Sequence, residues 1–322
     1  MADGPTIIFI HLGSALPSWL THALRQVRLF NKCRVVLAAE ADALDHLRLR
    51  PELAIDTISI QSLGISEKQR AFRDISPLDR QFRDSFWTYT TERFFVLETI
   101  MRQLSLSEVV HLENDVMLYC DLADLVPKLR ELYRGIAATF DNDRRCVPGF
   151  LYVPHSGSIG RLNDFIIARL QEIRLRQRGR TPIDVNDMSL LGHFRSQGPL
   201  AIDHLPIVPP DYAGILRSKL GHAAANPACY SKHFAMLQMI FDAAALGQYL
   251  GGVDFRSASC QGSGFINESC VFDPRAVQAR LCLDAAGRRV PVIETAAGIF
   301  PVANLHIHSK ALQLFSSATC EL

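Results

Sequence analysis

The chain has 322 residues, enough for one large α/β domain or two smaller ones with an ample core. Lys and Arg number 34 and Asp and Glu 33, so the net charge of +1 lacks the basic excess that general nucleic-acid binders show. Hydrophobic residues make up 48% and charged residues 21%, a composition that argues against disorder.

The first half of the chain alternates predicted strands and helices. We expect residues 6–11 to form a buried strand rather than a signal peptide, because no basic segment precedes them. Further elements are expected as a helix at 18–30, strands at 33–38 and 57–60, a helix and loop over the site at 64–86, and a helix at 92–103 capped by Thr90 or Thr91. Such alternation predicts a mostly parallel, doubly wound sheet.

The second half becomes richer in loops. We expect helices at 122–133, 160–178, 187–196 and 241–250, strands at 135–140, 150–153 and 201–208, a hairpin of 279–283 with 290–293, and a final extended segment at 299–308. No repeat or linker interrupts this order, so we expect one domain over residues 1–322.

The spacing of the cysteines and the hydropathy of the chain indicate the cellular compartment of the protein. The eight cysteines are scattered and form no C-x-x-C pair, which argues against a zinc ribbon or a disulfide scaffold and favours reduced thiols. No stretch approaches the roughly 18 apolar residues that span a bilayer. We therefore expect a cytoplasmic protein.

Two carboxylates end an apolar stretch at residues 109–116, VVHLENDV. If this stretch is one strand, His111, Glu113 and Asp115 share a face, since strand side chains alternate. Buried acids need a cationic partner, and Mg²⁺ or Mn²⁺ prefers carboxylate oxygens and keeps positions open for substrate phosphates. The alternative is a solvated turn after the strand.

A second cluster closes the chain, NLHIHSK at 304–310. His306 and His308 share a face of an extended segment, and one imidazole can complete a metal shell. Lys310 can meet a diphosphate as a point charge. The alternatives are two hydrogen-bonded structural histidines, or a zinc site for which further soft ligands are missing.

Together these two motifs resemble nucleotide-sugar glycosyltransferases of the GT-A fold. In the glycogenin-like members a D-x-D triplet ends a strand, a later histidine shares the metal and a lysine touches the diphosphate. The phrase ANLHIHSK is also similar to bacterial and large-virus glycan-building transferases. Because Glu113 replaces the first aspartate, Asp115 is the preferred metal ligand, followed by His308, nearest Lys310, and then His306.

The resemblance also implies residues around the donor. Glu113, Asn114 and Lys310 are expected to contact it, and Arg93 is expected near the nucleotide or diphosphate, with a surface helix cation as the alternative. His11 and Gly13 follow the first strand, where GT-A proteins hold the base and ribose; Gly13 lets the backbone approach a ligand or merely ends the strand. Residues 1–155 would form the nucleotide-sugar half and 156–322 the acceptor half.

Two acids are candidates for acceptor chemistry. Asp187, in the phrase NDMSLL that is part of the resemblance, is expected to act as general base or to contact the acceptor hydroxyl. Helix N-capping by Asn186 or Asp187 is the alternative. Glu268, in a glycine-flanked loop, is a rival base or a plain surface turn. The arginine-rich run at 174–180 suggests peripheral contact with the inner membrane face, or a solvated helix face.

The predicted function is a glycosyltransferase that depends on Mn²⁺ or Mg²⁺. It would move a sugar from a nucleoside diphosphate donor, with UDP favoured, to a glycan or glycolipid acceptor in cell-surface polysaccharide or glycoconjugate synthesis, without a nucleic-acid partner. One alternative is a non-catalytic nucleotide- or glycan-binding protein. A sugar-phosphate nucleotidyltransferase is less favoured, because the loop after the first strand lacks a glycine-rich basic run.

Overall fold

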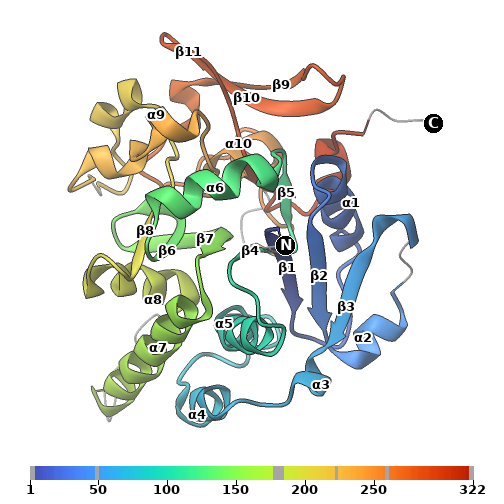
Figure 1. The fold of residues 1–322 in the computed structure, drawn as a ribbon. Coiled ribbons are helices and arrows are strands. Elements are labelled where there is room, and N and C mark those ends of the chain that lie inside the picture. The colour runs from blue at the N-terminus through green and yellow to red at the C-terminus, as the bar shows by residue number, and fades with distance from the viewer. Residues whose placement is uncertain (1–3, 48–50, 177–184, 222–223, 258–260, 319–322) are drawn as a thin grey trace.

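A seven-stranded sheet forms the centre of the structure, a computed structural model that describes residues 4–47, 51–176, 185–221, 224–257 and 261–318 (Figure 1). The strand order is β3-β2-β1-β4-β7-β6-β8. Neighbouring strands run parallel except where β7 meets β4 and β6, which confirms the predicted mostly parallel sheet. Its strands are β1 (Thr6–His11), β2 (Arg34–Ala39), β3 (Ile55–Ser59), β4 (Val109–Leu112), β6 (Ile136–Asn142), β7 (Arg145–Val153) and β8 (Ile202–His204).

Helices flank the sheet because its inner strands are apolar on both faces (Figure 1). In β1, five of the six residues are buried. The helices are α1 (Leu20–Phe30), α2 (Ala41–Asp45), α3 (Ile60–Leu63), α4 (Glu67–Ile75), α5 (Phe86–Gln103), α6 (Leu122–Leu132), α7 (Ser156–Arg176), α8 (Asp187–Phe194), α9 (Phe234–Leu237) and α10 (Ala245–Gly251).

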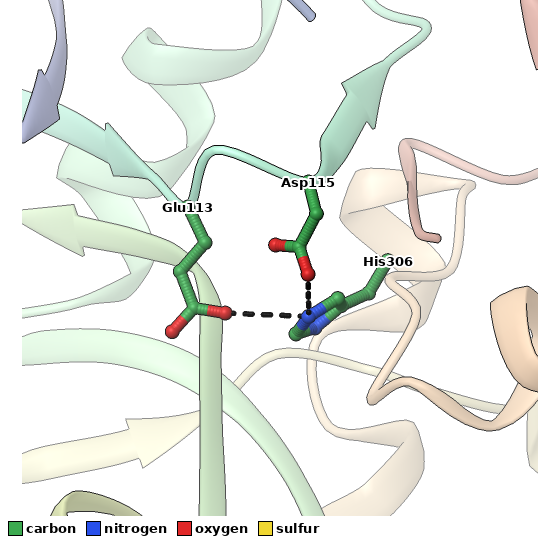
Figure 2. A group of neighbouring side chains, drawn as sticks. All are labelled: Glu113, Asp115 and His306. Carbon is green, nitrogen blue, oxygen red and sulfur yellow. Dashed lines mark hydrogen bonds and ion pairs between the residues drawn. The ribbon is translucent and has the colours of Figure 1, made fainter. Parts of the chain in front are cut away.

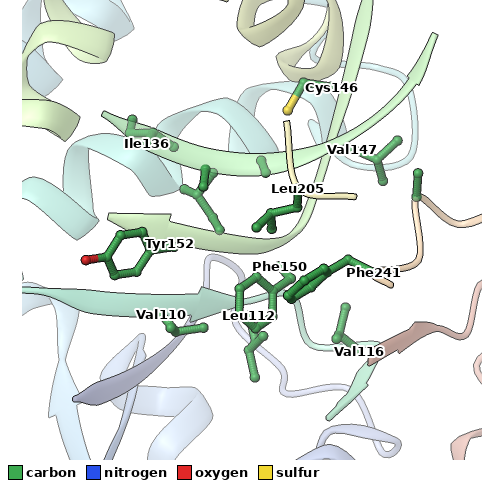
Figure 3. Packing of buried hydrophobic residues seen from close by; sticks show 14 of the residues in the cluster. Val110, Leu112, Val116, Ile136, Cys146, Val147, Phe150, Tyr152, Leu205 and Phe241 are labelled. Carbon is green, nitrogen blue, oxygen red and sulfur yellow. The ribbon is translucent and has the colours of Figure 1, made fainter. Parts of the chain in front are cut away.

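The core joins the early and late parts of the chain. Val110 and Leu112 of β4 pack beside Phe150 and Tyr152 of β7, and all four are fully buried (Figure 3). Phe241, from the loop-rich last third, meets Phe150 with ring centroids 5.0 Å apart. The C-terminal segments are therefore packed onto the central sheet.

Two small antiparallel sheets complete the fold. The predicted hairpin is confirmed as β9 (Gln278–Leu283) and β10 (Arg289–Thr295), extended by β11 (Gly298–Pro301), and lies apart from the central sheet (Figure 1). The other sheet pairs β5 (Val116–Leu118) with β12 (Asn304–His306). The extended segment predicted at 299–308 contains two short strands, β11 and β12, which pair with β10 and β5 respectively.

The long helix before the acidic motif starts earlier than predicted. α5 begins at Phe86, and the hydroxyls of Thr90 and Thr91 both donate to the carbonyl of Trp87, at 3.2 and 2.9 Å. These threonines therefore lie inside the helix, and the predicted N-cap is wrong.

The described part of the arginine-rich run contacts protein groups. Arg174 donates to the Asp74 carbonyl at 3.1 Å, and Arg176 pairs with Glu172 at 2.5 Å. Residues 177–180 of the run lie outside the described residues. Among the described helices, none combines the length and apolar character needed to cross a bilayer.

Candidate metal and diphosphate site

The two candidate acids lie in a tight turn between β4 and β5, not on one strand. The amide of Val116 donates to the Glu113 carbonyl at 3.1 Å and closes this turn. The shared strand face predicted for residues 111–115 is therefore wrong. His111 remains inside β4, is fully buried, and contacts the Ile8 carbonyl through Nδ1 at 3.0 Å.

The turn nevertheless directs both acids to one histidine. Nε2 of His306 lies 3.2 Å from Oδ2 of Asp115 and 3.4 Å from Oε2 of Glu113 (Figure 2). The β5–β12 register sets this meeting, because it places His306 opposite Val116. Lys310 also contacts the Asp115 carboxylate through Nζ. Residues about 190 positions apart in sequence thus form one polar cluster.

Three residues that the sequence analysis did not single out hold His306 in place. A Cβ on Gly149 would lie 2.9 Å from Nδ1 of His306, and one on Gly247 would lie 2.0 Å from its carbonyl oxygen. Buried Asp242 accepts hydrogen bonds from the amides of His306, at 3.0 Å, and Gly247, at 2.8 Å. In the sequence, the features that could have indicated this close packing were the Pro148-Gly149 pair and the glycine within the helix predicted at 241–250.

The charges of the cluster compensate one another. Burial alone would lower the pKa of His306, but the charge and hydrogen bond of Asp115, helped by Glu113, raise it to about 9. Burial likewise opposes ionisation of Asp115, yet His306 and Lys310 hold its pKa well below the usual range. Without a metal, a protonated His306 and Lys310 therefore balance the two acids.

The donor set fits a hard or borderline divalent ion. The ligand atoms of Glu113, Asp115 and His306 all lie within 4.8 Å of one another. An octahedral ion with ligands at about 2.1 Å places neighbouring ligand atoms about 3 Å apart, close to the 3.4 and 3.2 Å that separate His306 from Glu113 and Asp115. Two carboxylates and an imidazole suit Mn²⁺ better than Mg²⁺, which prefers oxygen ligands, provided that His306 gives up its proton.

Arg93 connects this cluster to Asp187. Its Nη2 lies 2.5 Å from Oε1 of Glu113 and 2.9 Å from Oδ2 of Asp187. Arg93 is only 7% exposed, so its alternative interpretation as a surface helix cation is wrong. Asn186, not Asp187, caps α8, through a capping box with Ser189.

Asp187 is left with a free carboxylate oxygen in a buried position. Burial raises the pKa of Asp187 to about 6, with Arg93 acting against the shift and Glu113 adding to it. Among the described residues, Oδ1 of Asp187, Nε of Arg93, Oδ1 of Asn114 and Nδ1 of His306 are buried without a hydrogen-bond partner. Several such atoms around one cluster indicate a place where a ligand supplies the missing bonds.

The carboxyl end of β1 lies beside the acidic turn. Since β1 and β4 are parallel neighbours, their ends meet at one sheet edge. Nδ1 of His11 lies 3.1 Å from Nδ2 of Asn114, and Nε2 of His11 lies 2.8 Å from the Ala15 carbonyl. Gly13 has φ +142°, a conformation that side chains disfavour, and passes close to the His11 ring. His11, Gly13 and Asn114 are thus brought together.

His308 and Glu268 are not brought into the cluster. Nδ1 of His308 accepts a hydrogen bond from the Asp254 amide at 3.0 Å, so this nitrogen is already occupied. The sequence preference for His308 over His306 therefore does not match the geometry. Glu268 is exposed, and within the described residues no ion pair reaches its carboxylate. Its main chain accepts a hydrogen bond from Leu220 at 3.4 Å.

Comparisons with known proteins give structural matches alone. No family model matches the chain, and no curated protein does. Mouse xyloside xylosyltransferase 1 in its apo form matches at 12% identity, covering 63% of this chain and 85% of that one, with a TM-score of 0.41. The galactosyltransferase LgtC, in complex with donor and acceptor sugar analogs, matches at 16% identity over 65% and 78%, with a TM-score of 0.40.

A third match is the glycosyltransferase GlyE of Streptococcus pneumoniae TIGR4. Its identity is 15%, it covers 62% of this chain and 45% of that one, and its TM-score is 0.34. All three carry glycosyltransferase names, the class that the sequence resembles. Because these TM-scores are below 0.5, the functional conclusion rests on the residues of the site.

Proposed function

We propose that this chain is a metal-dependent glycosyltransferase of GT-A type. It transfers a sugar from a nucleoside diphosphate donor, of which a UDP-sugar is the favoured one, to a glycan or glycolipid acceptor. The observation that carries the proposal is the convergence of Glu113, Asp115 and His306 within 4.8 Å, with Lys310 and Arg93 in contact with the two acids. Metal ligands and phosphate-binding cations are the parts that a diphosphate leaving group requires.

In this proposal Asp115, His306 and Glu113 are the residues that would hold Mn²⁺ or Mg²⁺. When bound, the ion stabilises the negative charge that develops on the leaving diphosphate. To act as a ligand, His306 would release its proton to solvent, and Nζ of Lys310 would be free to turn from Asp115 to a phosphate oxygen as a point charge. His11, Gly13 and Asn114 form the sheet edge for the nucleoside, in the half of the chain before residue 155.

Asp187 is assigned to the acceptor in preference to exposed Glu268. Its pKa of about 6 leaves the carboxylate ionised near neutral pH, as a general base requires. The Arg93 guanidinium holds one oxygen at 2.9 Å, and the other oxygen has no partner among the described residues. Since Asp187 is only 3% exposed, the groups that cover it must move aside before this oxygen can accept a proton or a hydrogen bond from a sugar hydroxyl.

The test is UDP release from a panel of UDP-sugars with Mn²⁺, with and without glycan acceptors. We expect slow hydrolysis of one donor, loss of release after chelation, and restoration by added Mn²⁺. Asp115→Asn should lose metal-dependent donor binding while keeping the wild-type circular dichroism spectrum. Tight donor binding without turnover under every acceptor would instead identify a non-catalytic binding protein. Unchanged activity of Asp115→Asn would overturn the metal assignment.

A further inference from the structure

An open groove is lined by residues that are not part of the metal cluster. Its volume is about 590 Å³, within the size range of small-molecule sites. It is bordered by the 3₁₀ turns Pro210–Ile215 and Pro274–Ala276, by α10, and by the β9–β10 hairpin. The residues that matter here are Tyr212, Tyr249, Arg275, Gln278 and Glu294. None of them belongs to the proposed metal and donor site.

The charged residues of the groove are already neutralised. Arg275 forms a two-pronged ion pair with Asp273, with Nε at 3.0 Å from Oδ1 and Nη2 at 2.6 Å from Oδ2. Glu294 lies 3.4 Å from Arg280 across the hairpin. A groove without an excess of either sign does not attract phosphates or polyanions, so its ligand is expected to be neutral.

The uncharged side chains suit a sugar. Tyr212 and Tyr249 are half-buried, and each offers a flat apolar ring with a polar hydroxyl at its edge. Among the described residues, the Gln278 amide and the two tyrosine hydroxyls make no hydrogen bond, so they are available to a ligand. Pyranose rings present both C–H faces and hydroxyl groups, which match this combination.

The groove and the metal cluster share one supporting helix. Gly247 of α10 packs against the carbonyl of His306, and Tyr249 lies two residues further along the same helix. We infer that the groove binds a neutral oligosaccharide, as the part of the glycan acceptor that lies away from the reacting hydroxyl. The inference that the groove binds a sugar does not depend on the proposed function. The inference that this sugar is the acceptor rests on it.

The direct experiment applies the metal-free full chain to an array of neutral and acidic glycans and measures the captured ligands by saturation-transfer NMR. We expect a neutral oligosaccharide to bind, and Tyr249→Ala and Gln278→Ala each to weaken its binding at least about tenfold, equivalent to about 1.4 kcal/mol. Tyr249→Phe, which keeps the ring, should retain most binding. Leu283→Ala, which shortens an exposed β9 side chain outside the groove, and exposed Gln171→Ala are the controls.

The outcomes separate this inference from the proposed function. In transfer assays Tyr249→Ala should raise KM for long acceptors while leaving kcat and acceptor-free UDP release unchanged. Asp115→Asn should still bind the oligosaccharide although transfer is lost. Absence of neutral glycan binding, preference for acidic glycans, or wild-type binding by both Tyr249→Ala and Gln278→Ala would overturn the inference. Glycan binding without any UDP release would support the groove as a glycan site and would contradict the proposed transferase function.

Discussion

Arg93 and Asp187 form a buried ion pair with 2.9 Å between Nη2 and Oδ2, and the same nitrogen lies 2.5 Å from Glu113. Arg93 comes from α5, Asp187 from the start of α8, and Glu113 from the turn after β4. One guanidinium therefore fixes a candidate metal ligand relative to the candidate base. Its loss should affect stability as well as chemistry.

Arg93→Met should destabilise the protein by about 3–5 kcal/mol, because two carboxylates lose their buried cationic partner. Urea denaturation at neutral pH measures this change. Arg34→Met is the matched control, since the Arg34–Asp56 pair is exposed and such pairs contribute about 0–1 kcal/mol. Equal losses in the two variants would mean that Arg93 does not hold the acids together.

His306→Ala should weaken Mn²⁺ binding more than His308→Ala. Among the described histidines, only His306 contacts both Glu113 and Asp115. One ring nitrogen of His308 is instead occupied by the Asp254 amide. We expect His306→Ala to lose at least the about 10–100-fold in affinity typical of removing an outer-shell partner. Titration of Mn²⁺ by electron paramagnetic resonance measures both variants. A greater loss in His308→Ala would exchange the two assignments.

The sequence predicted the sheet well because its strands are uninterrupted apolar runs. β1 has the predicted bounds, and β2 differs by one residue at each end. The acidic turn was considered only as a solvated alternative, because its alternating residues look like a continuing strand; in the structure Asp115 in this turn is 7% exposed. His306 and His308 have the same spacing pattern, so periodicity could not separate them. The β5–β12 register places His306, rather than His308, beside the acids. That register depends on contacts with residues distant in sequence, such as Gly149.

Gly149→Ala tests that contact. The added Cβ would lie 2.9 Å from Nδ1 of His306 and 3.2 Å from Cγ2 of Val116, so the imidazole must move. We expect a stability cost of about 1–3 kcal/mol, as in other overpacked sites, together with weaker Mn²⁺ binding. Gly262→Ala has open space around its Cβ and serves as the control. Wild-type Mn²⁺ affinity in Gly149→Ala would show that His306 need not stay where it lies.

His204 should make the protein sensitive to acid, independently of the metal site. It is fully buried, stacks on Phe140 with ring centroids 4.1 Å apart, and meets Tyr230 edge to face. Within the described residues, neither of its ring nitrogens has a hydrogen-bond partner. Burial, with a smaller contribution from Arg195, lowers the pKa of His204 from 6.5 to about 3. The folded state therefore keeps this ring neutral where the unfolded chain protonates it.

Between pH 6.5 and 3 the unfolded chain binds a proton at His204 that the folded chain does not, so this contribution to stability is complete above pH 6.5 and is lost as the pH falls. The loss from pH 7 to pH 5 is about 2 kcal/mol. His204→Phe keeps the aromatic packing and should remove that part of the pH dependence, measured by urea denaturation at both pH values. The control variant His46→Phe, which replaces an exposed histidine, should leave that part of the pH dependence in place. If His204→Phe retained the full wild-type difference, acid sensitivity would arise elsewhere.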